Sequence, residues 1–101
     1  MIFIHTTCKD MEEAQKLSDL IVENKIGACV DFWPISSCRK VKGSTVFQRR
    51  VKLLITTFES KLDAITTLIS KNHSEIIPLI GGVDVKRVNH PYKEWMMEVI
   101  K

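Results

Sequence analysis

The chain has 101 residues, of which 45% are hydrophobic and 27% are charged, and its formal net charge is +3. This length and composition are those of a single globular domain, residues 1–101. No apolar run reaches the roughly 18 residues of a membrane-spanning helix, and the first residues lack the basic and long apolar regions of a signal peptide. We therefore expect a cytoplasmic protein with no membrane partner.

Cysteine number and the placement of basic residues narrow the choice of partners. Cys8, Cys29 and Cys38 cannot all pair within one chain and form no CxxC motif, so we expect reduced thiols. A net charge of +3 is mild for a protein that binds nucleic acid. The densest basic region, residues 39–52, is more typical of a solvated hairpin arm than of a polyanion site. We expect no nucleic-acid partner.

The first quarter of the chain predicts a strand followed by a helix. Residues 2–7 are apolar on both faces, which indicates a strand covered on both faces. Asp10 is a good helix N-cap, and Glu13 completes a capping box. The helix should end at Asn24-Lys25, since Asn tolerates the left-handed conformation. The apolar stripe consists of Met11, Ala14, Leu17, Leu20 and Ile21, and the solvent face of Glu12, Glu13, Lys16, Asp19 and Glu23.

A long hairpin is predicted between residues 27 and 57. Residues 28–33 alternate between two faces, with Trp33 on the face opposite Phe32. Pro34 cannot donate a ladder hydrogen bond, so it predicts a bend, a bulge or an edge position. Lys42-Gly43-Ser44 marks the turn, and residues 46–57 form the returning strand. The hairpin should project beyond the body of the domain.

Two further helices are predicted in the second half of the chain. Ser60 is the expected N-cap of the first, with Asp63 in the capping-box position, and this helix should end near Lys71-Asn72. The last helix should be capped by Asn89 or His90. Its apolar stripe, which we expect to be buried, consists of Tyr92, Trp95, Met96 and Val99.

The segment between these two helices carries the fourth predicted strand. Residues 76–80 are apolar and contain Pro78, which predicts an edge strand or an irregular one. Gly81-Gly82 should end this strand, and residues 83–89 should form a linker.

The predicted order of elements is β-α-β-β-α-β followed by a helix. This is the α+β ferredoxin-like arrangement, an antiparallel sheet with two helices on one face. The helices leave the other face of the sheet uncovered, although Trp33 lies on it. Exposed apolar area of this kind usually marks an interface, so we expect a homo-oligomer.

Short pieces spread over nearly the whole length of the chain form a recognisable pattern. The pieces are Thr6-Thr7-Cys8-Lys9-Asp10, Ala14-Gln15-Lys16-Leu17, Lys25-Ile26-Gly27-Ala28-Cys29-Val30, Pro34, Gly43, Val51-Lys52-Leu53-Leu54-Ile55-Thr56-Thr57, His73 with Pro78, and Tyr92-Lys93-Glu94-Trp95. No single piece is specific. Their order and spacing together resemble the CutA family, whose members are named for tolerance to divalent cations.

The resemblance implies a fold, an assembly and a ligand. Proteins of the CutA family have the ferredoxin-like fold and form compact trimers, related in architecture to PII signalling proteins, in which each hairpin reaches a neighbouring subunit. The resemblance also implies a link to copper and other divalent metals. We therefore expect a non-catalytic homotrimer that binds copper or another divalent cation, with no metal required for folding.

Several positions differ from the family pattern where metal chemistry would lie. Many members carry Cys where this chain has Thr6, and the usual His-Pro-Tyr is His73-Ser74-Glu75 here. Gln48 and Arg50 stand at positions that are commonly acidic, and Val41 replaces a Trp. The resemblance therefore implies the trimer more strongly than a tight metal site.

Cys8 and His73 are the candidate metal ligands. Cys8 precedes the first helix, whose N-terminus favours a thiolate. His73 holds the family's His position after the second helix, where an imidazolium that caps the helix is the structural alternative. Cys29 should pack as a small buried hydrophobe, and Cys38 lies in the hairpin. No pair of these residues has the spacing of a structural zinc site.

No catalytic motif is present: the sequence has no GxSxG, no P-loop and no GxGxxG. We therefore expect no enzyme activity. Two binding alternatives stay open beside the metal. One is a trimeric interaction scaffold without a ligand. The other is a PII-like module that binds a small anion through Lys40, Lys42, Arg49 or Arg50.

Overall fold

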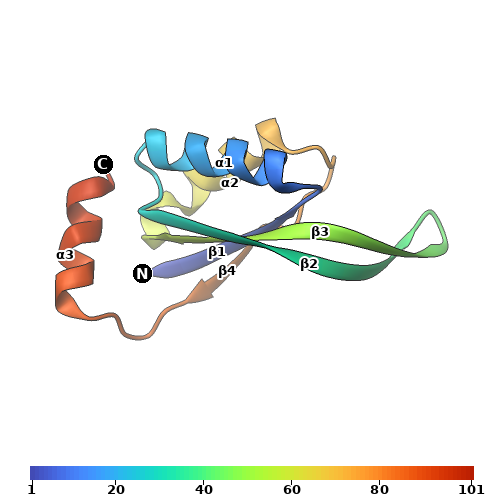
Figure 1. Ribbon diagram of the computed structural model, residues 1–101. Helices are drawn as coiled ribbons and strands as arrows, with labels where there is room; N and C mark the ends of the chain where they lie inside the picture. Colours follow the sequence, from blue (N-terminus) through green and yellow to red (C-terminus); the bar gives the residue numbers. More distant parts are fainter.

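Residues 1–101, all described by the computed structural model, form one four-stranded antiparallel sheet and three α-helices. The elements are β1 (Ile2–Cys8), α1 (Met11–Glu23), β2 (Cys29–Val41), β3 (Ser44–Thr57), α2 (Leu62–Asn72), β4 (Gly81–Asp84) and α3 (His90–Val99). The strand order is β2-β3-β1-β4. α1 and α2 cover one face of the sheet, and α3 lies at its end (Figure 1). The predicted ferredoxin-like arrangement with a terminal helix is confirmed. No helix is long and apolar enough to cross a membrane.

β1 is a central strand, paired with β3 on one side and with β4 on the other. Its side chains alternate, so that Ile4 and Cys8 are fully buried beneath the helices while Phe3 lies on the open face. Ile4 packs with Ile21 of α1 and Ile65 of α2. The buried face of β1 therefore ends at Cys8, which lies beneath the helices shortly before the start of α1.

The start of α1 is where the capping box predicts it. Asp10 Oδ1 accepts a hydrogen bond from the Glu13 N–H at 2.9 Å, which satisfies one free amide of the first turn. The Glu13 carboxylate accepts from the Lys9 N–H, one residue before the N-cap, also at 2.9 Å. Two expectations about this helix are therefore wrong. Glu13 is only 8% exposed instead of lying on the solvent face, and Met11 is 48% exposed instead of buried.

The hairpin of β2 and β3 keeps one regular register from Cys29, opposite Thr56, to its tip. Lys42 and Gly43 both have positive φ, as a two-residue type I′ turn requires. Pro34 lies opposite Val51 on the edge strand without a shift of register, so its position is the edge expected from the sequence. The arm projects beyond the helices (Figure 1) and gives the molecule its longest dimension of 46 Å.

The fourth strand is displaced from its predicted position. Residues 76–80 are irregular, and the strand is instead Gly81–Asp84, which pairs with β1. A Cβ on Gly81 would lie 2.6 Å from Nε2 of His5, and one on Gly82 would lie 2.8 Å from Cδ1 of Ile2. The two glycines therefore leave room for the His5 and Ile2 side chains beside β4, and they form a strand instead of breaking one.

Three helix ends differ from the sequence expectation. Lys25, with φ of 59°, adopts the left-handed conformation that we expected of Asn24. Ser60 lies inside a short 3₁₀ turn, and Lys61 holds the N-cap position of α2 without a side-chain hydrogen bond. Asn89 precedes α3 as predicted, but its side chain makes no capping bond. Residues that suit a cap are therefore not always used as one.

α3 docks on the body through part of its apolar stripe, with Met96 as its one fully buried residue. Met96 is fully buried with Ala28 and Ile100, whereas Trp95 is 40% exposed and meets Tyr92 edge-on, with ring centroids 5.2 Å apart. The expected burial of Trp95 is therefore wrong for the isolated chain. The reason is the position of α3 at the end of the sheet, where only part of its apolar stripe meets the body (Figure 1).

The neighbouring methionines of α3 provide a matched test of this attachment. Met96→Ala should lower the free energy of unfolding by about 2–5 kcal/mol, because it leaves a cavity at a fully buried position. Met97→Ala should change it by about 0.5 kcal/mol or less, because Met97 is 61% exposed. Urea denaturation followed by circular dichroism measures both. Equal losses for the two variants would show that α3 is not docked through Met96.

Candidate metal centre

Three donor side chains meet at the end of β1. The Cys8 Sγ, a Glu13 carboxylate oxygen and a His73 ring nitrogen all lie within 4.8 Å of one another. They come from the last residue of β1, the first turn of α1 and the residue after α2. The sequence predicted Cys8 and His73, and the fold brings these two together. Glu13 was missed because helical periodicity placed it on the solvent face. The signal that could have found it is its capping-box position, which turns the side chain back toward β1.

Glu13 is held by donors from two segments. Its Oε1 accepts from the Lys9 N–H at 2.9 Å and from the Ser74 hydroxyl at 3.0 Å, and its Oε2 accepts from the Ser74 N–H at 2.8 Å. Burial by itself would raise the pKa of Glu13, but the hydrogen bonds from Lys9 and Ser74 outweigh it and lower the pKa. The carboxylate is therefore ionised and fully engaged with neutral donors.

His73 uses both ring nitrogens. Nε2 lies 2.8 Å from the Thr7 carbonyl oxygen, to which it donates, and Nδ1 accepts from the Glu75 N–H at 3.0 Å. This donor and acceptor pattern is that of the neutral Nε2–H tautomer. His73 follows α2 as its C-cap residue, but its ring bonds to β1 and its own loop. The ring therefore does not cap α2, which was the structural alternative to a metal ligand, but cross-links the loop to β1.

The pKa of the Cys8 thiol is raised, although a position close to a helix N-terminus was expected to favour the thiolate. Cys8 is fully buried on the core face of β1, and burial, followed by the charge of Glu13, raises the pKa of its thiol to about 12. A Cys, a His and an acid in one place could suggest nucleophilic catalysis. A buried and protonated thiol is a poor nucleophile, and Glu13 makes no hydrogen bond that would orient His73.

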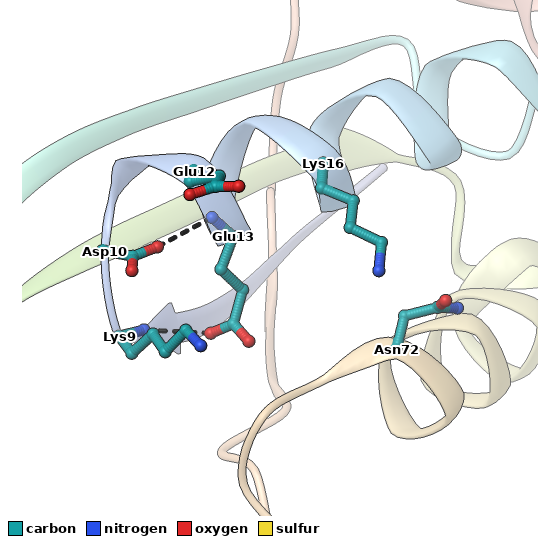
Figure 2. Close-up of a pocket in the computed structure, with 6 residues that line it drawn as sticks. All are labelled: Lys9, Asp10, Glu12, Glu13, Lys16 and Asn72. Carbon is teal, nitrogen blue, oxygen red and sulfur yellow. Dashed lines mark hydrogen bonds between the residues drawn. The ribbon is translucent and has the colours of Figure 1, made fainter.

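A polar cavity of about 220 Å³ lies beside this group, between α1 and the end of α2. Figure 2 shows the Glu13 carboxylate turned toward the Lys9 amide, and Lys16 of α1 pointing toward Asn72 of α2. Glu13 is the only one of the three donors that lines the cavity. The cavity therefore provides an approach to the group from the side of its carboxylate.

Thr6 adds an unsatisfied oxygen to the same face of β1. It is fully buried two residues before Cys8, and its Oγ1 is the one buried side-chain polar atom without a hydrogen-bond partner. A buried hydroxyl left without a partner is costly. The sulfur, oxygen and nitrogen atoms of Cys8, Glu13 and His73 lie at a spacing that could hold a divalent cation.

The other candidate thiols and His90 lie elsewhere. Cys29 is half-buried instead of buried, and its Sγ donates to Asp31 at 3.7 Å. Burial, followed by the charge of Asp31, raises the pKa of Cys29. Cys38 is exposed on the hairpin, and His90 meets Glu94 at 2.9 Å on the surface of α3. None of these residues joins the group at the end of β1.

Two basic residues of the hairpin are already paired. Arg50 and Arg39 both meet Glu75 Oε1, at 2.7 Å and 3.0 Å, and the Arg39 Nε donates to Gln48. The Arg50 side chain is only 10% exposed. This ion-pair group connects the hairpin to the loop after α2, two residues from His73.

Comparison with known proteins identifies the family. Residues 2–99 match the model of the CutA1 divalent ion tolerance protein family. The chain is 31% identical over 96 residues to chloroplastic Protein CutA 1 of Oryza sativa, covering 94% of this chain and 54% of that protein. It thus spans about half the length of the rice relative.

Solved structures agree with this match. A crystal structure of CutA1 from Pyrococcus horikoshii has a TM-score of 0.97 at 26% identity and covers 100% of this chain and 99% of that one. The structure of the periplasmic divalent cation tolerance protein CutA from Archaeoglobus fulgidus has a TM-score of 0.96 at 24% identity, with 100% of both chains covered. The family match over residues 2–99 and these similarities establish that the chain belongs to the CutA family.

Proposed function

We propose that this protein is a non-catalytic, homotrimeric binding protein for a divalent cation, held by Cys8, Glu13 and His73, and that it acts in metal tolerance. The observation that carries this proposal is the meeting of the three donors within 4.8 Å from three separate elements. Relatives are named for tolerance to divalent cations. The family name refers to tolerance of divalent cations, and the group of Cys8, Glu13 and His73 is a possible binding site for such an ion.

The donor set favours copper among the divalent metals. Thiolate and imidazole suit copper and zinc better than the hard cations, and copper(II) stands at the top of the affinity order for such sites. A cation would also compensate the buried charge of Glu13 and of a Cys8 thiolate. The cytoplasmic location stays a prediction, because relatives include proteins named chloroplastic and periplasmic.

The trimer is proposed from the apolar surface that one chain leaves uncovered. Trp33 and Val83, on the open face of the sheet, are 43% and 55% exposed. In the loop after α2, Ile76 and Ile77 are 99% and 87% exposed. Exposed apolar area of this extent marks an interface. A closed ring of identical chains would cover it together with the edges of the sheet.

The anion-binding alternative has less support. Of the proposed basic residues, Arg50 is already paired with Glu75, and Lys40 and Lys42 lie exposed along the arm near its tip. A scaffold without a ligand is the remaining alternative, and it is the outcome if no metal binds.

Calorimetric titration with Zn²⁺, which has no redox chemistry with thiols, and anaerobically with Cu²⁺ tests the metal site. The wild type should bind one ion per chain, with Cu²⁺ bound more tightly than Zn²⁺. Cys8→Ser should weaken binding by at least about tenfold, because the loss of even an outer-shell partner of a metal ligand typically costs about 10- to 100-fold. Cys38→Ser is the matched control, because Cys38 is exposed and remote, and it should change nothing. Unchanged affinity after Cys8→Ala with His73→Ala would refute the site, and no binding by the wild type would refute the metal role.

The pH dependence of binding should follow the Cys8 thiol. With its pKa raised to about 12, Cys8 stays protonated at neutral pH, so the cation must displace the proton. Lower pH should therefore weaken binding, and Kd should fall about tenfold per unit rise in pH from about pH 7 to 9. Titrations in two buffers of different ionisation enthalpy measure the released proton. Cys8→Ser should flatten the dependence, and a wild-type affinity that ignores pH in this range would exclude Cys8 as a ligand.

Sedimentation equilibrium tests the assembly. The mass should be about three times the chain mass of 11.6 kDa and should hold down to micromolar concentration, as obligate interfaces do. Trp33→Asp should reduce the mass toward that of the monomer, because it places a charge on the apolar open face. Gln15→Asp, on the exposed side of α1, is the control and should leave the mass unchanged. A well-folded wild-type monomer would contradict the trimer.

A further inference from the structure

The proposed metal ligands already hold a loop in place. The loop of residues 73–80 joins α2 to β4. It contacts α1 and β1 through the Glu13 carboxylate and the His73 ring, two of the three proposed metal ligands. His73 donates to the Thr7 carbonyl, Ser74 donates twice to Glu13, and the Glu75 N–H donates to His73 Nδ1. We call these four hydrogen bonds the loop anchor. Every bond of the loop anchor involves Glu13 or His73.

A cation needs the lone pairs that the loop anchor uses. If His73 binds a metal through Nδ1, it loses the Glu75 N–H bond, and if it binds through Nε2, it must give up the proton that it donates to Thr7. Glu13 Oε2 accepts from the Ser74 N–H, and Oε1 accepts from two donors. Whichever ring nitrogen coordinates the metal, binding disrupts part of the loop anchor.

We infer that cation binding at Cys8, Glu13 and His73 competes with the hydrogen bonds of Ser74 and Glu75, so that the bound metal holds His73 itself but frees the loop from Ser74 onward. This inference rests on the proposed metal function. It follows from the use of the same atoms for both purposes. Because coupling between two equilibria is reciprocal, weakening the loop anchor must strengthen metal binding by the same factor.

The release has a consequence at the surface. Glu75 of the loop carries the ion pairs to Arg50 and Arg39 of the hairpin, and Ile76 and Ile77 follow it with exposures of 99% and 87%. Freeing the loop from Ser74 onward would therefore move this apolar segment together with Glu75, the ion-pair partner of the hairpin. Metal binding would thus change the surface that we propose to pair with other copies of the chain.

Hydrogen exchange of the wild-type protein with and without Zn²⁺ tests the inference directly. The Ser74 and Glu75 amides are donors of the loop anchor, so they should exchange faster, by about tenfold or more, when Zn²⁺ is bound. Amides in the middle of α1 should not exchange faster, which excludes general destabilisation.

Ser74→Ala tests the reciprocal effect without changing a proposed ligand. It removes the hydroxyl that donates to Glu13 at 3.0 Å. Zn²⁺ should then bind about 10- to 150-fold more tightly, the factor expected for one lost hydrogen bond to a charged group. Ser70→Ala is the matched control, because Ser70 is exposed on α2, and its affinity should equal that of the wild type. A serine with a merely structural role would give no tighter binding when removed.

The possible outcomes separate the two proposals. Zn²⁺ binding with unchanged or slower exchange at Ser74 and Glu75, or with equal or weaker affinity in Ser74→Ala, would overturn the competition and leave the metal site standing. No Zn²⁺ or Cu²⁺ binding by the wild type would overturn both. If Ser74→Ala does not fold, the exchange measurement on the wild type decides alone.

Discussion

The rest of the structure depends on the burial of one charged group, the Glu13 carboxylate. An ionised carboxylate that is only 8% exposed must be surrounded by donors, because the loss of hydration costs several kcal/mol. The donors are the amide before the N-cap and two groups of Ser74. These contacts join the first turn of α1 to the loop after α2. They thereby fix His73 against β1 and bring its ring within reach of Cys8.

The position of this group follows from the order of the strands. β1 lies between β3 and β4, so its final residue emerges in the middle of the sheet, where α1 begins and α2 ends. Three chain segments therefore converge at one point without any of them being long. The same order leaves β2 as an edge strand, and its hairpin with β3 extends away from the helices (Figure 1). Cys8, Glu13 and His73 thus lie together at the end of β1, while the apolar and basic side chains of the hairpin lie on the projecting arm.

Local patterns sufficed for the hairpin, the capped start of α1 and the order of elements, because these depend on alternation, turn residues and caps within a few positions. They failed where distant contacts decide. Gly81 and Gly82 resemble a breaker in sequence, but they form a strand because they pair with β1, where their missing Cβ atoms leave room for the side chains of His5 and Ile2. Trp95 lies on the same helical stripe as Met96, but Met96 is fully buried against the body while Trp95 stays 40% exposed.

In the candidate site, too, some features follow from local sequence and others from distant contacts. Cys8 and His73 could be chosen from residue type and family pattern, but their proximity is set by the packing of α2 against α1 and β1. Glu13 could not be placed by periodicity, since its burial depends on donors from Ser74, which is 61 residues away in sequence. The raised pKa of Cys8 likewise reflects burial in the core, which outweighs the effect of the helix N-terminus.

The charges of the hairpin connect the site to the arm. Residues 32–58 contain six basic residues and no Asp or Glu, and Asp31, the one carboxylate of β2 and β3, forms no ion pair with Arg39 or Arg50. Both arginines meet Glu75 instead. Glu75 is placed by the loop, and the loop is anchored by Glu13 and His73. The pairing of both arginines therefore depends on a carboxylate that the hairpin does not contain, and through it on the group at the end of β1.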